Sequence, residues 1–290
     1  LSLSANVEAT IDLDFACGNP DGVLFAVPSN HLRTVAKKIA PALKNCPRIL
    51  NAAKGLEHDS GKRLSEVLAE ALGDQVDSES DRVANDRVAI LSGPNLAGEV
   101  AAGKIGASVI ASPNASVAKV FQEALSTRFF RIYRHTDRIG VELGGTLKNI
   151  FAIGAGIVET LGLGDNAKAA YLTRALHEMV RLGVRLGGRL PTFYGLAGLG
   201  DLMATSSSPL SRNHQLGRAI ALGQTQAFFD MHRRNVIEGV ETARMAREWS
   251  KKLTIPMPIT EEICRVLFEG KAPPEAAKDL MSRSLKDEEE

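Results

Sequence analysis

The chain has 290 residues, of which 44% are hydrophobic and 24% charged, and its formal net charge is +1. This composition is typical of a folded globular protein with one or two domains. A charge so close to zero gives no general attraction for nucleic acid or an anionic membrane, so any anion has to be bound at a local site.

The cysteines and the N-terminus give expectations about the compartment. Cys17, Cys46 and Cys264 are far apart and have neither metal-ligand spacing nor the pattern of a disulfide framework. We therefore predict no metal site and a reducing, cytoplasmic location. The first residues have no basic leader followed by an apolar core, so they do not form a signal peptide. The chain also lacks an initiator Met, from which we expect a missing beginning.

The first half of the chain alternates short apolar segments with helical patterns. Strands are predicted at 23–27, 48–53, 88–92, 107–111 and 129–133, with helices at 32–43, 61–72, 95–101 and 116–125. Continuous apolar strands that alternate with helices predict a mainly parallel sheet covered on both faces. The polar segment 73–86 is expected to be a solvent loop.

Several polar residues follow the predicted strand ends. In parallel sheets, ligands bind beyond the carboxyl ends of the strands, and Ser29, Lys54 and residues 93–95 all lie there. Gly93-Pro94 either presents free amides to an oxyanion or is an ordinary turn.

After Asp137 helical periodicity dominates. Helices are predicted at 140–161, 166–186, 212–222, 239–252, 260–269 and 274–281. The fold class is therefore α/β plus all-α, with domains at 1–136 and 137–290. The longest apolar run, 139–163, is interrupted by Glu142, Lys148 and Glu159, so we predict a buried helix and no membrane span.

Lys148 lies in the part of the chain that is richest in small residues. Its neighbours at helical spacing include Gly144, Gly145 and Ala152, which leave much of that helix face bare. Burial of the ammonium would lower its pKa and suit a proton carrier near neutral pH. The alternative is an ion pair with Glu142 or another acid across the helix packing.

Two loops of the helical half also carry chemically useful groups. The Gly-rich segment 195–201 ends in Asp201, but no strand precedes it, so it is not a dinucleotide fingerprint. Helix packing with Asp201 as an N-cap is an alternative. Ser211, Arg212 and Asn213 combine a hydroxyl, a guanidinium and an amide that can hold a phosphate. Here the alternative is that Ser211 caps the following helix.

These motifs resemble those of the bacterial type of NAD(P)-dependent glycerol-3-phosphate dehydrogenase. They occur in the order and spacing of that family over essentially the whole chain. The matching strings are Gly55-Leu56-Glu57 after Lys54, and residues 92–101, 141–149, 162–168, 195–201, 211–213 and 236–239. The resemblance implies a Rossmann-like domain followed by an all-helical domain of the 6-phosphogluconate-dehydrogenase-like type. It also implies NAD or NADP as cofactor and a homodimer.

The resemblance further implies a reaction and residue roles. The reaction is the reversible reduction of dihydroxyacetone phosphate to sn-glycerol 3-phosphate, which feeds glycerophospholipid synthesis. Lys148 is similar to the general acid/base, Lys54 to the lysine that stabilises the alkoxide, and Asp201 to the acid that orders the lysines. The implied substrate contacts are Lys54, Gly93, Asn95, Lys148, Asp201, Ser211, Arg212 and Asn213. The implied cofactor contacts are Lys54, Ala97, Arg212, Val236 and Glu238. Asn149 and Thr205 correspond to further polar positions.

The chain departs from the family pattern in two ways. The family begins with a strand, a GxGxxG turn and a helix that bind the cofactor pyrophosphate, whereas Leu1 corresponds to a point inside that domain. We therefore expect a truncated nucleotide-binding domain that lacks the groups distinguishing NAD from NADP. Asn95 replaces a Ser or Thr and resembles the eukaryotic branch. Two alternatives stay open: a β-hydroxyacid dehydrogenase acting on a carboxylate, and a catalytically silent fragment.

Overall fold

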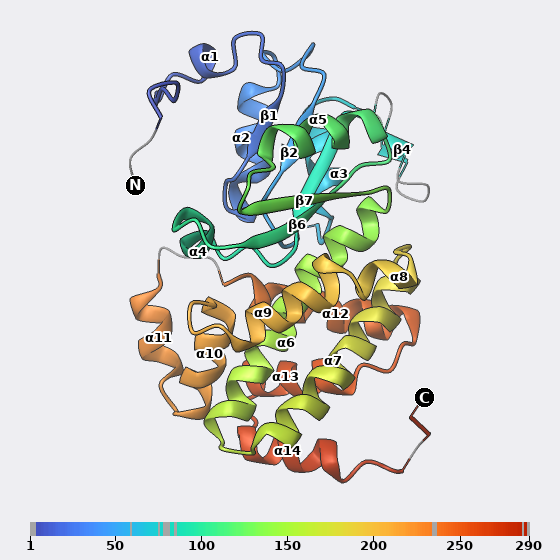
Figure 1. Cartoon of the computed structure of the whole chain (residues 1–290). Coiled ribbons are helices and arrows are strands. Elements are labelled where there is room, and N and C mark those ends of the chain that lie inside the picture. Colours follow the sequence, from blue (N-terminus) through green and yellow to red (C-terminus); the bar gives the residue numbers. More distant parts are fainter. Residues whose placement is uncertain are drawn as a thin grey trace. The chain divides into compact units, whose positions relative to one another are not determined.

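The structure is a computed structural model that describes residues 4–58, 60–74, 76–77, 82–83, 86–233, 237–285 and 287–288. The chain forms two compact units (Figure 1). Unit 1 comprises Leu1–Thr146 and Leu186–Asp201, and unit 2 comprises Leu147–Arg185 and Leu202–Glu290. The predicted division at residue 136 stays a prediction.

Unit 1 is built on a five-stranded sheet with the order β1-β2-β5-β6-β7. Its strands are β1 (Val23–Phe25), β2 (Ile49–Asn51), β5 (Val88–Ser92), β6 (Gly106–Ala111) and β7 (Phe130–His135). Only the β5–β6 pair of this sheet is antiparallel. The predicted mainly parallel sheet is therefore confirmed, and the carboxyl ends of β1, β2 and β5 lie at one edge.

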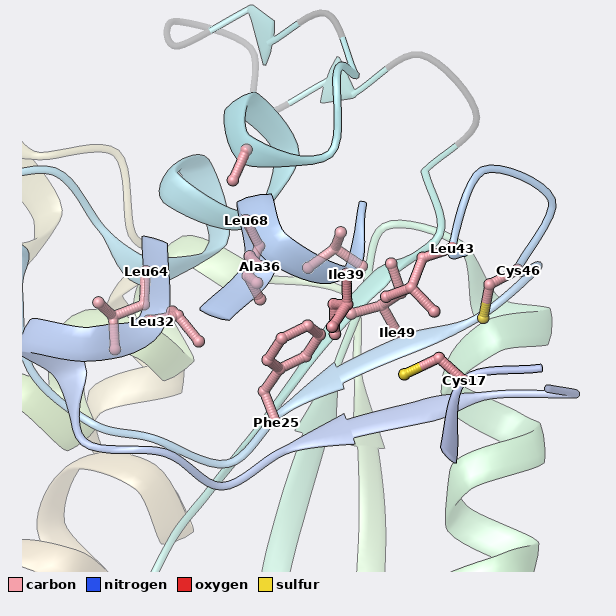
Figure 2. Packing of buried hydrophobic residues seen from close by; sticks show 12 residues of the cluster. Cys17, Phe25, Leu32, Ala36, Ile39, Leu43, Cys46, Ile49, Leu64 and Leu68 are labelled. Atoms are coloured by element: carbon pink, nitrogen blue, oxygen red, sulfur yellow. The ribbon is translucent and has the colours of Figure 1, made fainter. Parts of the chain in front are cut away.

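Helices cover both faces of the sheet. On one face, α2 (Leu32–Ile39) and α3 (Leu64–Ala71) pack their apolar sides on β1 and β2. Figure 2 shows Phe25 and Ile49 of these strands against the buried side chains of both helices. On the other face, α5 (Ala115–Leu125) packs Phe121 against the sheet. This burial of apolar area is the main stabilisation of the unit.

The structure also contains short elements that the sequence patterns did not reveal. Two form the antiparallel hairpin β3 (Val76–Asp77) and β4 (Arg82–Val83) inside the segment predicted as a loop. The others in unit 1 are α1 (Leu13–Ala16), η1 (Ser29–His31), α8 (Leu190–Phe193) and η2 (Leu196–Gly200). The predicted helix at 95–101 is shorter, as α4 (Ala97–Ala101). Elements of two to five residues are too short to show a helical or strand period.

The regular elements described in unit 2 are all helices. The predicted helices appear within two residues of their expected starts, and α9 and α11 are additional. The helices that lie in or enter this unit are α6 (Arg138–Thr160), α7 (Asp165–Arg185), α9 (Asp201–Ser207), α10 (Arg212–Ala221), α11 (Thr225–Met231), α12 (Glu238–Leu253), α13 (Pro258–Phe268) and α14 (Pro273–Met281). Helices α6 and α9 both begin in unit 1 and continue into unit 2.

Helix α6 is long and apolar enough to cross a membrane, but 94% of its most apolar window is buried inside the protein. It is therefore a core helix. Its glycines allow close packing: a Cβ added at Gly156 would lie 2.2 Å from the carbonyl oxygen of His214 in α10. A Cβ at Gly217 of α10 would lie 1.9 Å from the carbonyl oxygen of Ile153. The backbones of α6 and α10 thus touch directly.

Candidate active site

Lys54 is the centre of a polar cluster in unit 1. Its Nζ donates to the Asp201 carboxylate at 2.6 Å, to the Gly93 carbonyl oxygen at 2.9 Å and to Asn95 Oδ1 at 3.1 Å. The side chains of Lys54 and Asp201 are 16% and 3% exposed. Four residues predicted from three separate loops are therefore brought together around one ammonium.

The position of Lys54 follows from the turn that ends β2. The buried Asn51 side chain accepts a hydrogen bond from the Ala53 amide and donates one to the Ala53 carbonyl oxygen. Gly55 then adopts a φ of +123°, which a residue with a Cβ rarely adopts. The Thr146 hydroxyl of α6 lies 3.3 Å from both the amide and the carbonyl oxygen of Gly55. Asn51 and Thr146 were not predicted, although an Asn in a buried strand and a Thr beside a Gly pair are signals for such roles.

Glycines keep side chains away from the cluster. Gly93 has a φ of +120°, and a Cβ there would lie 3.1 Å from the Cα of Ser108. A Cβ at Gly145 of α6 would lie 2.2 Å from Ser92 Oγ and 3.7 Å from Cδ of Lys54. The face of α6 at Gly145, which the sequence predicted to be bare, thus lies against the aliphatic part of the Lys54 side chain.

Asp201 is held by a wide turn. In η2 the amide of Gly200 donates to the carbonyl oxygen of Gly195, five residues earlier, at 3.1 Å, which defines a π-helical turn. A Cβ at Gly198 would lie 2.0 Å from the carbonyl oxygen of Phe193. Turns of this type occur frequently at functional sites. The segment packs closely, as expected, but Asp201 is the first residue of α9 and not its N-cap, and its carboxylate accepts the bond from Lys54.

Lys148 lies in unit 2 and is buried, with 6% of its surface exposed. Its Nζ donates to the hydroxyl of Thr205 in α9 at 2.5 Å. The carboxylate of Glu142, the predicted alternative partner, accepts hydrogen bonds from the amide and hydroxyl of Ser65 in unit 1. A lowered pKa of Lys148 stays a prediction.

The predicted phosphate-binding residues occupy the start of α10. Ser211 is the N-cap, and its hydroxyl accepts from the His214 amide at 3.3 Å, which confirms the capping alternative. Arg212 is exposed at the first helical position. Asn213 is buried: its Nδ2 donates to Asn149 Oδ1, and its Oδ1 accepts from the Gly239 amide, each at 3.0 Å. Asn213 therefore ties α10 to α6 and α12.

A buried histidine lies one residue beyond Asn213. The Nε2 of His214 lies 3.3 Å from a carboxylate oxygen of Glu159 in α6, which also pairs with Lys168 at 2.8 Å. Burial lowers the pKa of His214, because the charged imidazolium loses its hydration. The bond from Lys168 lowers the pKa of Glu159. His214 thus brings this polar cluster next to the segment Ser211 to Asn213 in α10.

The edge formed by β1, β2 and β5 fits a nicotinamide cofactor in its chemistry. The ends of the parallel strands and the Gly93 turn provide an open backbone. The Lys54 ammonium provides a donor for oxygen atoms of a ligand. Of the predicted cofactor residues, Ala97 begins α4 and is exposed, and Glu238 begins α12. Val236 lies outside the described residues.

Comparisons with known proteins agree with this arrangement. The family model described as the N-terminus of NAD-dependent glycerol-3-phosphate dehydrogenase matches residues 1–118, and the C-terminal model matches residues 137–278. The glycerol-3-phosphate dehydrogenase [NAD(P)+] of Frankia casuarinae is 44% identical over 98% of this chain and 82% of its own length. The chain belongs to the NAD-dependent glycerol-3-phosphate dehydrogenase family.

Other members give the same result. The enzyme of the same name from Enterococcus faecalis is 42% identical over 100% of this chain and 83% of its own length. The crystal structure of glycerol-3-phosphate dehydrogenase from Coxiella burnetii superposes with a TM-score of 0.85 at 37% identity, covering 97% of this chain and 82% of that one. The resemblance in the sequence is thus confirmed for the family and for the Rossmann-like and helical fold.

Proposed function

We propose that this chain catalyses the reversible reduction of dihydroxyacetone phosphate to sn-glycerol 3-phosphate with NADH or NADPH, supplying glycerophospholipid synthesis. The observation that carries the proposal is the set of contacts from Lys54 to Asp201, Gly93 and Asn95. These residues match the family positions for substrate and catalysis. Membership of the family supports the reaction over that of a β-hydroxyacid dehydrogenase.

The proposed chemistry divides between the two lysines. NAD(P)H, when bound, supplies the hydride that reduces the carbonyl carbon. Lys148 donates a proton to the carbonyl oxygen and takes it back in the reverse direction. Lys54 stabilises the negative charge that develops on that oxygen, and Asp201 holds the Lys54 ammonium in place. Asn95 holds Lys54 from its other side through Oδ1.

The remote phosphate is proposed to bind at the start of α10. The exposed Arg212 offers a guanidinium for two parallel hydrogen bonds to phosphate oxygens. Ser211 and Asn213 flank it, and the bonds from Asn213 to Asn149 and Gly239 fix the helix start. Binding a remote dianion positions the reacting carbonyl and raises turnover.

Several finer assignments belong to the same proposal. Gly93 contacts the substrate, and Ala97, Val236 and Glu238 contact the cofactor together with Lys54 and Arg212. Residues 1–136 serve nucleotide binding and 137–290 form the helical substrate-binding domain. The enzyme is a cytoplasmic homodimer.

The reaction is tested with the purified chain. Oxidation of NADH and NADPH is followed by the loss of absorbance of the reduced nicotinamide, with dihydroxyacetone phosphate and, in parallel, with small 3-oxo acids. We expect turnover with the triose phosphate and none with the acids. Turnover with the acids would favour the carboxylate enzyme. Absence of turnover together with absence of NADH and NADPH binding by calorimetry would favour a silent fragment.

A further inference from the structure

The loop that leads from β2 to α3 carries Lys54 near its start. Leu56 and Arg63, near the two ends of this loop, form an antiparallel bridge. Gly55 precedes the bridge and Ser65 follows it. The two ends of the loop are therefore linked to each other, and whatever fixes them limits the movement of the Lys54 backbone.

Glu142 of α6 holds the far end of the loop. Its carboxylate accepts from the amide of Ser65 at 2.8 Å and from the Ser65 hydroxyl at 2.6 Å. Ser65 lies in the first turn of α3, where backbone amides have no partner inside the helix. The guanidinium of Arg63 lies 3.4 Å from the same carboxylate. All three residues are buried, so removal of the carboxylate would leave buried donors without this acceptor.

Thr146 of α6 holds the near end of the loop. Its hydroxyl lies 3.3 Å from both the amide and the carbonyl oxygen of Gly55, the residue after Lys54. Thr146 is buried as well. The backbone next to Lys54 is therefore anchored to α6 by a single hydroxyl group.

Gly145 makes room for the lysine between these two anchors. Gly145 and Thr146 are three and four positions beyond Glu142, so all three lie on one face of α6. A Cβ at Gly145 would lie 3.7 Å from Cδ of Lys54. One helix face thus contacts the start of the loop, the Lys54 side chain and the end of the loop. All of these residues belong to unit 1.

From these contacts we infer that Glu142 and Thr146 are positioning residues for Lys54, which fix its loop on α6 and so direct its ammonium to Asp201 and Gly93. The inference rests on the role proposed for Lys54 in the reaction. A lysine side chain is flexible, so the place of its ammonium depends on where the backbone is anchored. A small misplacement of a catalytic group lowers the rate strongly.

The positioning is tested on the Lys54 ammonium itself. Its hydrogen-bonded protons exchange slowly with water, and NMR of the chain with isotope-labelled lysine follows this exchange. Thr146→Val keeps the shape of the side chain and removes the hydroxyl, so it should accelerate the exchange about fivefold. Glu142→Met should act similarly, because Ser65 loses its acceptor. Thr146→Ser, which retains the hydroxyl, should exchange as the parent chain does.

The matched control is Glu66→Met. Glu66 belongs to α3 itself and accepts from the amide of Arg63 at 2.9 Å. Its loss weakens the start of α3 from within, so the thermal midpoint should fall as in Glu142→Met while the Lys54 exchange stays unchanged. Unchanged exchange in both α6 variants, or equal acceleration in Glu66→Met, would overturn the inference.

Turnover with dihydroxyacetone phosphate separates this inference from the proposed function. In Thr146→Val, kcat should fall about fivefold together with the change in exchange, and it should recover in Thr146→Ser. Faster exchange in the variants of a chain that shows no turnover would support the positioning and refute the proposed function. An unchanged kcat in an active chain with faster exchange would show that the place of Lys54 does not limit the reaction, and would overturn the inference.

Discussion

The two lysines to which the proposal assigns the reaction have different contacts within their own units. Lys54 donates to a carboxylate, a carbonyl oxygen and an amide oxygen. Lys148 donates to the hydroxyl of Thr205. At the level of residues, the proposal gives Lys54 the role of a fixed charge and Lys148 the role of the proton carrier.

The role proposed for Lys148 predicts the effect of Lys148→Ala. Turnover with dihydroxyacetone phosphate should fall by about 10²–10³-fold or more, because the proton donor is lost. Binding of NADH or NADPH, measured by calorimetry, should persist. The exposed Lys119 of α5 provides the control, since Lys119→Ala should leave turnover unchanged. Near-normal turnover of the Lys148 variant would exclude this residue as the acid.

Arg212→Ala is expected to act on substrate binding instead. Loss of a charge-assisted bidentate contact should raise the KM for dihydroxyacetone phosphate by about 10–100-fold, with a smaller effect on kcat. Arg218→Ala is the control, because Arg218 is exposed farther along the same helix. Steady-state kinetics measures KM and kcat of both variants. A KM equal to that of the parent chain would contradict the phosphate assignment.

At the level of elements, the contact between α6 and α10 depends on missing side chains. Gly217→Ala would place a Cβ 1.9 Å from the Ile153 carbonyl oxygen, a backbone atom that cannot move alone. We expect the free energy of unfolding to fall by about 1–3 kcal/mol. Urea unfolding can be followed by the fluorescence of the single Trp, Trp249, which lies in α12 of unit 2.

Gly98→Ala is the matched control for that variant. A Cβ at Gly98 of α4 meets nothing within 4 Å, so the substitution should cost no stability and favours the helix by about 0.5–1 kcal/mol. If Gly217→Ala left the Trp249 transition where it is in the parent chain, the direct backbone contact would be wrong.

The elements also show how far the sequence could be interpreted. The long helices and all five strands of the main sheet were predictable, because each carries several apolar residues at one period. The turn η2 was not, because a five-residue π-helical turn depends on contacts with Phe193 and α6 that no local pattern encodes. For the same reason, Lys54 and Asp201 could be named from the family motifs, but the supporting bonds of Asn51 and Thr146 could not.

At the level of the whole molecule, one buried carboxyl group links stability to pH. Glu178 of α7 accepts hydrogen bonds from the amides of Ile259 and Thr260 at the start of α13, at 2.5 and 3.0 Å. Burial raises the pKa of Glu178 to about 7, although these bonds oppose the rise. The folded protein therefore retains a proton at pH values where the unfolded chain has lost it. This contribution to stability is complete below pH 4.5 and is lost as the pH rises through about 7.

Glu178→Gln should remove that pH dependence. Between about pH 5 and 7 the parent chain should lose up to about 1.4 kcal/mol of unfolding free energy per pH unit relative to the variant. The difference between the two urea-unfolding series isolates Glu178 from the titration of the histidines. A constant difference across this range would show that Glu178 is ionised in the folded protein.

Unit 1 includes the segment Leu186–Asp201, which the ribosome makes only after Leu147–Arg185 of unit 2. During synthesis, Val109 and Val141 cannot complete their apolar cluster until Ala197 has been made. Such long-range contacts slow folding. The nascent sheet therefore exposes apolar surface until residue 201 has left the exit tunnel, and this is the interval in which a chaperone has most to protect.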